Sequence, residues 1–438
     1  MLVLVGVGLA VAWVWFFGLP GRGVTVVLRP IDGATALMVR GTGRDATLFR
    51  VDARGTPLWR ARIASFVDPF VPWGGLAISN GLVAYGVQVG HDGTVHARSL
   101  ADGSEVWTSA LRWYDTHESV VDSNVFAAGT PGAFVFVGGG SPVRLTGFDV
   151  KDGATMWRRD LFGTPDHLWV RGSFVLVAGK MNGESYRIDA HEGRLRSVGS
   201  ETPCVTDDEI VYQTFDRLAK DSFAGGKAFG RQAKDDSLWM AGPCGVRGGD
   251  LVMLANGIDR AVLLGRAPDL DETWRVELRG LRPVETGLGA YADLLPLARQ
   301  PARFVPMLLA TRGSGELQLV VFDLDARAEA WRSPPSPKFA GFALYRRGDV
   351  DYLMDTTHIA AIDGATGDVL SAVRITGGLP LQPYHVAGGK LWIATPSGRV
   401  GTLDGRTLVP DAQVDGIVVN DDRPAFAQLL GRPFDDAL

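Results

Sequence analysis

The sequence "DVKDGATMW" (149–157) decides the fold, because close variants of it return along the chain. An apolar residue and Asp end one strand, a polar stretch with Gly turns the chain, and an apolar residue with Trp opens the next strand. Each copy therefore predicts a β-hairpin corner with a large apolar anchor behind it. The variants are "DARGTPLW" (52–59), "SLADGSEVW" (99–107), "DLDARAEAW" (323–331) and "DGATGDVLS" (363–371).

The spacing of these corners predicts a repeat architecture. Clear corners, aligned four residues before the Trp position, stand at Gly55, Gly103, Gly153, Gly193, Arg327 and Gly367. Weaker copies are "AKDDSLW" ending at Trp239, "PDLDETW" ending at Trp274 and "GTLDGRTLV" (401–409). A unit of roughly 40–50 residues with three or four short strands has the size of one β-propeller blade.

A second mark supports this unit, namely a polar turn followed by a short apolar strand. Examples are "NGLVAYGV" (80–87), "GSFVLVAG" (172–179) and "GKLWIATP" (389–396). We therefore expect an all-β chain folded as a β-propeller of four-stranded blades. Eight blades are expected, within a range of seven to nine, with one surplus corner assigned to an irregular excursion within 200–280.

The repeated phrase, hydrophobic-Asp-x-x-x-Gly-x-x-x-Trp, resembles the repeat of the pyrroloquinoline-quinone-like (PQQ-like) β-propellers. That superfamily includes quinoprotein alcohol dehydrogenases and the propeller lipoprotein of the outer-membrane β-barrel assembly machinery. The resemblance covers roughly 24–420 and implies that the corner tryptophans pack between neighbouring blades. The implied wedges are Trp59, Trp107, Trp157 and Trp331, with Trp239 and Trp274 as weaker members.

The first nineteen residues, "MLVLVGVGLAVAWVWFFGL" (1–19), carry no charge. At ~1.5 Å per residue such a helix spans about 28 Å, close to the hydrocarbon thickness of a bilayer. We expect a single uncleaved transmembrane anchor, a propeller domain over 24–420 and a C-terminal tail at 421–438, in which "AFAQLL" suits one or two helical turns.

The orientation of this anchor is ambivalent in the sequence. Arg22 and Arg29 follow the apolar stretch, and positive charge near a helix end favours the cytoplasmic side. The habit of the resembled family favours the opposite side. On that basis we expect a cytoplasmic-membrane protein with its propeller in the periplasm.

Two cysteines, Cys204 and Cys244, are the only ones in the chain. They stand one blade period apart, each follows Pro and each precedes an apolar strand, so they are candidates for equivalent positions in adjacent blades. A disulfide is one interpretation and suits an oxidising compartment. Two small buried apolar side chains are the other.

The sequence offers no catalytic centre. The resembled dehydrogenases bind their quinone over two adjacent cysteines, and no such pair occurs here. His91 and His96 flank a turn without an identifiable third metal ligand. We expect no catalytic residue, cofactor or metal. The net charge of −5 argues against a nucleic-acid partner.

Three functions remain open at this level. The first is a non-enzymatic, membrane-anchored scaffold that binds protein partners in the cell envelope, with a role in envelope assembly. The second is a diverged quinone-dependent dehydrogenase, against which the missing cysteine pair counts. The third is a sensor that binds a small ligand in the propeller channel.

Overall fold

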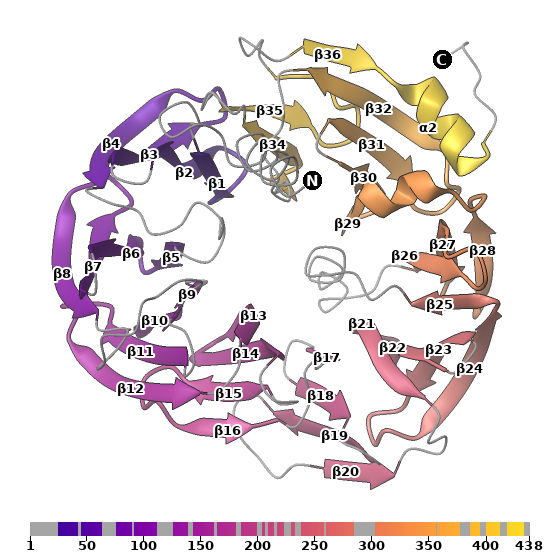
Figure 1. Cartoon of the computed structure of the whole chain (residues 1–438), viewed down its shortest axis with the longest axis horizontal. Coiled ribbons are helices and arrows are strands. Elements are labelled where there is room, and N and C mark those ends of the chain that lie inside the picture. Colours follow the sequence, from indigo (N-terminus) through magenta and orange to yellow (C-terminus); the bar gives the residue numbers. More distant parts are fainter. Residues whose placement is uncertain are drawn as a thin grey trace, which may run out of the picture.

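The computed structural model describes most of the chain as antiparallel sheet. The described ranges are 25–42, 45–63, 76–89, 92–111, 126–138, 143–161, 164–180, 185–198, 204–205, 209–213, 217–222, 229–232, 238–257, 260–283, 303–355, 357–376, 386–394, 400–411 and 418–432. Within them, nine sheets stand around a common centre, as the blades of a β-propeller do (Figure 1). We number them blade 1 to blade 9 in chain order.

The first four blades each contain four consecutive strands. Blade 1 is β1 (Thr25–Pro30), β2 (Thr35–Thr42), β3 (Asp45–Asp52) and β4 (Pro57–Ile63). Blade 2 is β5 (Leu76–Ser79), β6 (Leu82–Val89), β7 (Asp92–Ser99) and β8 (Glu105–Leu111). Blade 3 is β9 (Phe126–Gly129), β10 (Ala133–Gly138), β11 (Val143–Asp149) and β12 (Thr155–Leu161). Blade 4 is β13 (Thr164–Arg171), β14 (Phe174–Lys180), β15 (Tyr186–Asp189) and β16 (Leu195–Ser197).

The next three blades repeat this order. Blade 5 is β17 (Cys204–Val205), β18 (Glu209–Gln213), β19 (Arg217–Ser222) and β20 (Phe229–Gln232). Blade 6 is β21 (Trp239–Arg247), β22 (Asp250–Asn256), β23 (Arg260–Arg266) and β24 (Glu272–Arg279). Blade 7 is β25 (Leu281–Pro283), β26 (Phe304–Thr311), β27 (Leu317–Asp323) and β28 (Ala328–Arg332), followed by the 3-10 helix η2 (Pro337–Gly341).

The last two blades depart from four strands. Blade 8 is β29 (Ala343–Arg347), β30 (Val350–Met354), β31 (His358–Asp363) and β32 (Val369–Thr376), with β36 (Val418–Asp421) added at its edge. Blade 9 has three strands, β33 (Val386–Ala387), β34 (Lys390–Ala394) and β35 (Val400–Asp404). The first strand of a blade lies nearest the centre, and the fourth strand lies at the rim (Figure 1).

The described residues thus form nine sheets, one more than the eight expected and at the top of the expected range. The segment 200–280 contains two ordinary blades rather than an irregular excursion. The candidate corner "AKDDSLW" was wrong, because Trp239 begins β21, the innermost strand of blade 6.

The corners explain why the motif recurs. The Asp that ends a third strand accepts hydrogen bonds from backbone N–H groups of the turn, as Asp52 does from Arg54 and Thr56. The aligned corner residue then has positive φ, which favours Gly. The φ values are 78° at Gly55, 74° at Gly103, 73° at Gly153, 66° at Gly193 and 78° at Gly367.

Three corners use a non-glycine residue at positive φ: Leu270, Arg327 and Leu408. Such a conformation costs roughly 1–2 kcal/mol for a residue with a Cβ atom. Packing offsets this cost, because Leu270 and Leu408 are buried in the core and the Arg327 guanidinium lies 5.7 Å from the ring centroid of Trp274. The weak copy "PDLDETW" is therefore a genuine corner.

The ring closes between blade 9 and blade 1. The indole of Trp392 on β34 is fully buried and packs with Ala36, Met38 and Val51 of blade 1. The Thr402 hydroxyl of blade 9 also donates to the Ala53 carbonyl of blade 1 at 3.3 Å, so side-chain packing and this hydrogen bond join the two blades among the described residues.

The C-terminal segment returns to blade 8. After β36, helix α2 (Arg423–Leu430) buries Phe426, Ala427 and Leu430 and ends at Gly431 with positive φ. This agrees with the expected short helix in the tail. No helix within the described ranges is both long and apolar enough to cross a membrane, and the anchor predicted at 1–19 lies outside those ranges.

Candidate functional site: the interface between blades 8 and 9

Blades pack through a tryptophan on the fourth strand that points at the corner of the next blade. The indole Nε1–H of Trp59 donates to the Leu100 carbonyl at 2.8 Å. Trp107 donates to the Val150 carbonyl and Trp157 to the Ala190 carbonyl, each at 2.9 Å. These carbonyls lie three residues before the corner glycine of the following blade, so the contact is the same in all three interfaces.

The ring face of each indole rests on the next corner glycine. A Cβ atom built on Gly103, Gly153, Gly193 or Gly367 would lie within 3.0 Å of the indole of Trp59, Trp107, Trp157 or Trp331, respectively. Real Cβ atoms essentially never approach another atom that closely. Glycine is therefore required at these corners for the close approach as well as for positive φ.

Trp331 has an additional partner. Its indole Nε1–H is buried without a hydrogen bond acceptor, and the Arg432 guanidinium lies 4.9 Å from its ring centroid. Arg432, two residues beyond the end of α2, thus lies over the interface between blades 7 and 8.

The interface between blades 8 and 9 lacks this tryptophan. Ser371 on β32 pairs with Ala361 next to a β-bulge, the register position at which Trp107 pairs with Ala97 and Trp157 with Gly147. Ser371 is therefore the structural equivalent of a wedge tryptophan. Its hydroxyl donates to the Thr407 carbonyl at the corner of blade 9, so a short polar side chain stands where blades 1, 2, 3, 6 and 7 place an indole.

Blade 9 also has no fourth strand among the residues described up to Asp411. The chain after its corner makes an isolated bridge between Leu403 and Pro410, and its backbone hydrogen bonds include the one from Asp411 N–H to the Thr402 carbonyl. It next appears as β36, which pairs with β32 of blade 8, for example Val373 with Asp421. In the part of the chain that the structure describes, β36 thus extends blade 8, and blade 9 is left with three strands.

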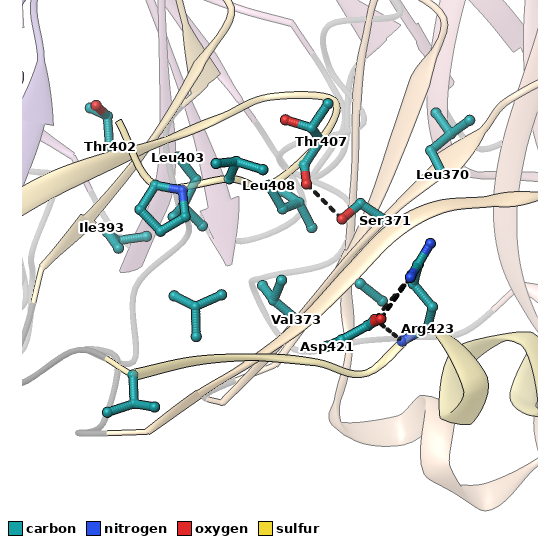
Figure 2. Close-up of a pocket in the computed structure, with 15 residues that line it drawn as sticks. Leu370, Ser371, Val373, Ile393, Thr402, Leu403, Thr407, Leu408, Asp421 and Arg423 are labelled. Carbon is teal, nitrogen blue, oxygen red and sulfur yellow. Dashed lines mark hydrogen bonds and ion pairs between the residues drawn. The ribbon is translucent and has the colours of Figure 1, made fainter. Parts of the chain in front are cut away.

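These two departures leave a groove between the blades, with a cavity volume of about 770 Å³. Figure 2 shows Val373 facing Ile393, Leu403 and Leu408 across it. The groove is lined by Leu370, Ser371, Ala372, Val373, Ile393, Thr402, Leu403, Thr407, Leu408, Val409, Pro410, Val418, Val419, Asp421 and Arg423. Its wall is mostly aliphatic, which suits apolar contact with a ligand or partner.

Two exposed valines mark the rim of this groove. Val409 is 60% exposed and Val418 is 55% exposed, and both belong to the small group of large apolar side chains that the described surface exposes. At one end, Arg423 donates to the Asp421 carboxylate at 2.8 Å, and these hydrogen bonds hold the pKa of Asp421 below its ordinary value. The charged end is thus internally paired, and the open part is apolar.

A second hollow of about 600 Å³ lies among turns of blades 1, 8 and 9. Its Arg406 forms an ion pair with Asp349 at 2.9 Å, and Tyr352 donates to the Gly405 carbonyl. In each pair one residue belongs to blade 8 and the other to blade 9, so the polar groups of this hollow are already used in contacts between blades. We therefore take the groove as the stronger candidate site.

The cysteines lie differently from the expectation in one respect. Cys204 is on β17 and Cys244 on β21, so both stand on innermost strands rather than just before them. Cys204 is buried and disulfide-bonded. The chain has one other cysteine, Cys244, whose side chain lies outside the described part, and the pairing stays a prediction.

The remaining site expectations have limited outcomes. His96 stacks on Tyr85 and its Nδ1 lies 3.0 Å from Glu105, while His91 lies outside the described residues. No group of three potential metal ligands occurs among the described residues. The groove itself was missed, although "DGATGDVLS" already showed Ser at the tryptophan position.

Residues 14–222 match the profile of the family described as outer membrane protein assembly factor BamB, a PQQ-type repeat family. The resemblance to PQQ-like propellers predicted from the corners is confirmed by this match. Among solved structures, the chain is similar to BamB from Moraxella catarrhalis, at 14% identity over 86% of this chain and 92% of that chain, with a TM-score of 0.46.

It is also similar to the quinohemoprotein alcohol dehydrogenase from Comamonas testosteroni, at 14% identity over 93% of this chain and 76% of that chain, with a TM-score of 0.41. No curated protein matches the chain significantly. Propellers described as an assembly factor and as a dehydrogenase thus both appear among the similar proteins.

Proposed function

We propose that this protein is a non-enzymatic propeller that binds protein partners in the cell envelope, in a role in envelope assembly. The observation that carries the proposal is the groove between blades 8 and 9, where two exposed valines border an aliphatic wall. Exposed apolar patches of this kind mark interaction surfaces more often than scattered single residues do. The match of residues 14–222 to an assembly-factor family supports the same reading.

The proposal includes a location. Residues 1–19 anchor the chain in the cytoplasmic membrane, and the propeller stands on the periplasmic side. The disulfide at Cys204 supports this side, because disulfides persist in oxidising compartments. Protease added to spheroplasts should digest the propeller. Digestion only after the membrane is opened would place the propeller in the cytoplasm.

The partner surface is tested by site-specific photocrosslinking in intact cells. A crosslinking residue replaces Val409 or Val418 at the groove, and Leu58 on β4 serves as the control because it is 53% exposed and does not line the groove. We expect discrete protein adducts from the two groove positions and none from Leu58. The same adducts from all three positions, or none from any, would contradict a partner surface here.

The enzymatic alternative has its own test. The purified chain is incubated with pyrroloquinoline quinone, calcium and a panel of alcohols and sugars in the presence of a redox dye. We expect unchanged quinone absorbance and no dye reduction. Substrate-dependent dye reduction would contradict the scaffold function and support a dehydrogenase.

A further inference from the structure

We propose that the groove receives an extended segment of a partner protein, which places an aromatic side chain beside Ser371. This inference rests on the proposed function and names the chemistry of the partner. Its starting point is the register equivalence of Ser371 with Trp107 and Trp157. In those interfaces an indole on an outer strand lies against the glycine of the next corner, whereas the corner of blade 9 carries Leu408 and the groove lies beside it and Ser371.

The groove is continuous with a packed interface. Val373, Ile393, Leu403 and Leu408 line it and also belong to the apolar core between blades 8 and 9, where each is at least nine-tenths buried. The cavity of about 770 Å³ falls within the range of sites that enclose organic groups of drug size. An aromatic side chain entering here would extend a core that already exists.

The corner also offers an acceptor. Indoles in the other interfaces donate to a corner carbonyl of the next blade, as Trp107 does to Val150. At the corner of blade 9, the carbonyl at the equivalent position, that of Gly405, already accepts from the Tyr352 hydroxyl. The Thr407 carbonyl, one residue before the corner and beside the groove, accepts from the Ser371 hydroxyl. A carbonyl oxygen has two lone pairs, so Thr407 can accept a second hydrogen bond from an incoming indole N–H.

An extended occupant fits the strand arrangement. β36 is the edge strand of blade 8, and edge strands are the usual templates for pairing with an added strand. Alternate side chains of a strand paired there would face the groove, between Val418 on β36 and Val409 at the corner. This is the arrangement in which main-chain hydrogen bonds give affinity and a side-chain pocket gives specificity.

The occupant is a different protein rather than a second copy of this chain. The outer-strand tryptophans at 59, 107, 157 and 331 already contact the next corner within their own ring. The described C-terminus also ends elsewhere, with Arg432 over Trp331 at the interface of blades 7 and 8. Neither supplies a free aromatic strand for the groove.

The probe for this inference comes from the chain itself. The peptide TMWRRDL reproduces β12 (155–161), an outer strand with a wedge tryptophan, and TMARRDL is its matched control. We expect the labelled tryptophan peptide to bind the full-length protein in fluorescence anisotropy. The alanine peptide should bind at least ~10-fold more weakly, because the aromatic burial is lost.

Protein variants locate the binding. Ser371→Trp fills the groove from within and should weaken the tryptophan peptide at least ~10-fold, while Val106→Trp on the outer strand β8 leaves binding unchanged. If Ser371→Trp does not fold, Val409→Asp with Val418→Asp places charge on the rim, where both residues are exposed. That variant should weaken the peptide to a similar extent.

Several results would overturn the inference. These are equal binding of the two peptides, binding that survives Ser371→Trp, or binding of free indole without binding of the peptide. Tighter peptide binding by Phe434→Ser would instead assign the groove to the tail of this chain. If the peptide fails while Val409 still crosslinks to protein in cells, the aromatic strand is wrong and the scaffold function stands. If peptide binding and crosslinking from Val409 are both absent, the scaffold function is wrong as well.

Discussion

The contact between each indole and the next corner glycine can be tested with a pair of matched substitutions. Gly153 and Gly81 both have φ of +73°. A Cβ atom on Gly153 would collide with the Trp107 ring, whereas nothing lies within 4 Å of a Cβ atom on Gly81. Gly81→Ala therefore measures backbone strain alone, and Gly153→Ala measures strain together with the collision.

The two contributions have different sizes. Positive φ costs an alanine roughly 1–2 kcal/mol. Inserting a methyl group into a well-packed contact adds roughly 1–3 kcal/mol. We therefore expect Gly153→Ala to lower the free energy of unfolding by about 2–5 kcal/mol and Gly81→Ala by about 1–2 kcal/mol.

The assay is urea unfolding of both variants, repeated in a Trp107→Ala background. Without the indole, most of the extra loss of Gly153→Ala over Gly81→Ala should disappear, because only the Ser109 hydroxyl, 2.7 Å from the added Cβ atom, remains in its way. Equal losses for the two single variants, or a Gly153→Ala loss that is undiminished without Trp107, would refute the wedge as described.

Three further predictions test other contacts. Trp392→Ala should lower the free energy of unfolding by about 3–5 kcal/mol, because this buried indole packs between blades 9 and 1. Trp59→Ala is the control: it removes a half-buried indole and should lower the free energy of unfolding less in the same urea titration. Hydrogen bonds from Arg303 lower the pKa of Asp323 to about 2, so this carboxylate stabilises the fold above its unfolded pKa of ~3.9, and that stability is lost as pH falls toward 2. In Arg303→Gln, carboxyl NMR should find a higher Asp323 pKa, and an unchanged value would contradict the pairing. Cys204→Ser should lower stability by about 2–4 kcal/mol and leave one reactive thiol, at Cys244, in mass mapping; no free thiol would exclude that pairing.

Local sequence determined the corners of this protein. The Asp at the end of a third strand caps the turn within a few residues, as Asp189 does for His191 and Glu192, and the glycine four residues on takes positive φ. The Asp cap and the positive φ of the glycine both depend on residues that are close in the chain, so the sequence motif predicts the corner. The tryptophan positions follow from the same spacing.

Tertiary structure alone decided the number of blades and the groove. β36 could in principle complete blade 9, yet it pairs with β32 of blade 8, more distant in the chain than β35. Ser371 likewise acquires meaning only when the corner of blade 9 lies opposite it. Strand pairing and packing between blades depend on residues far apart in sequence, and their outcome depends on which contacts compete for the same edge in space.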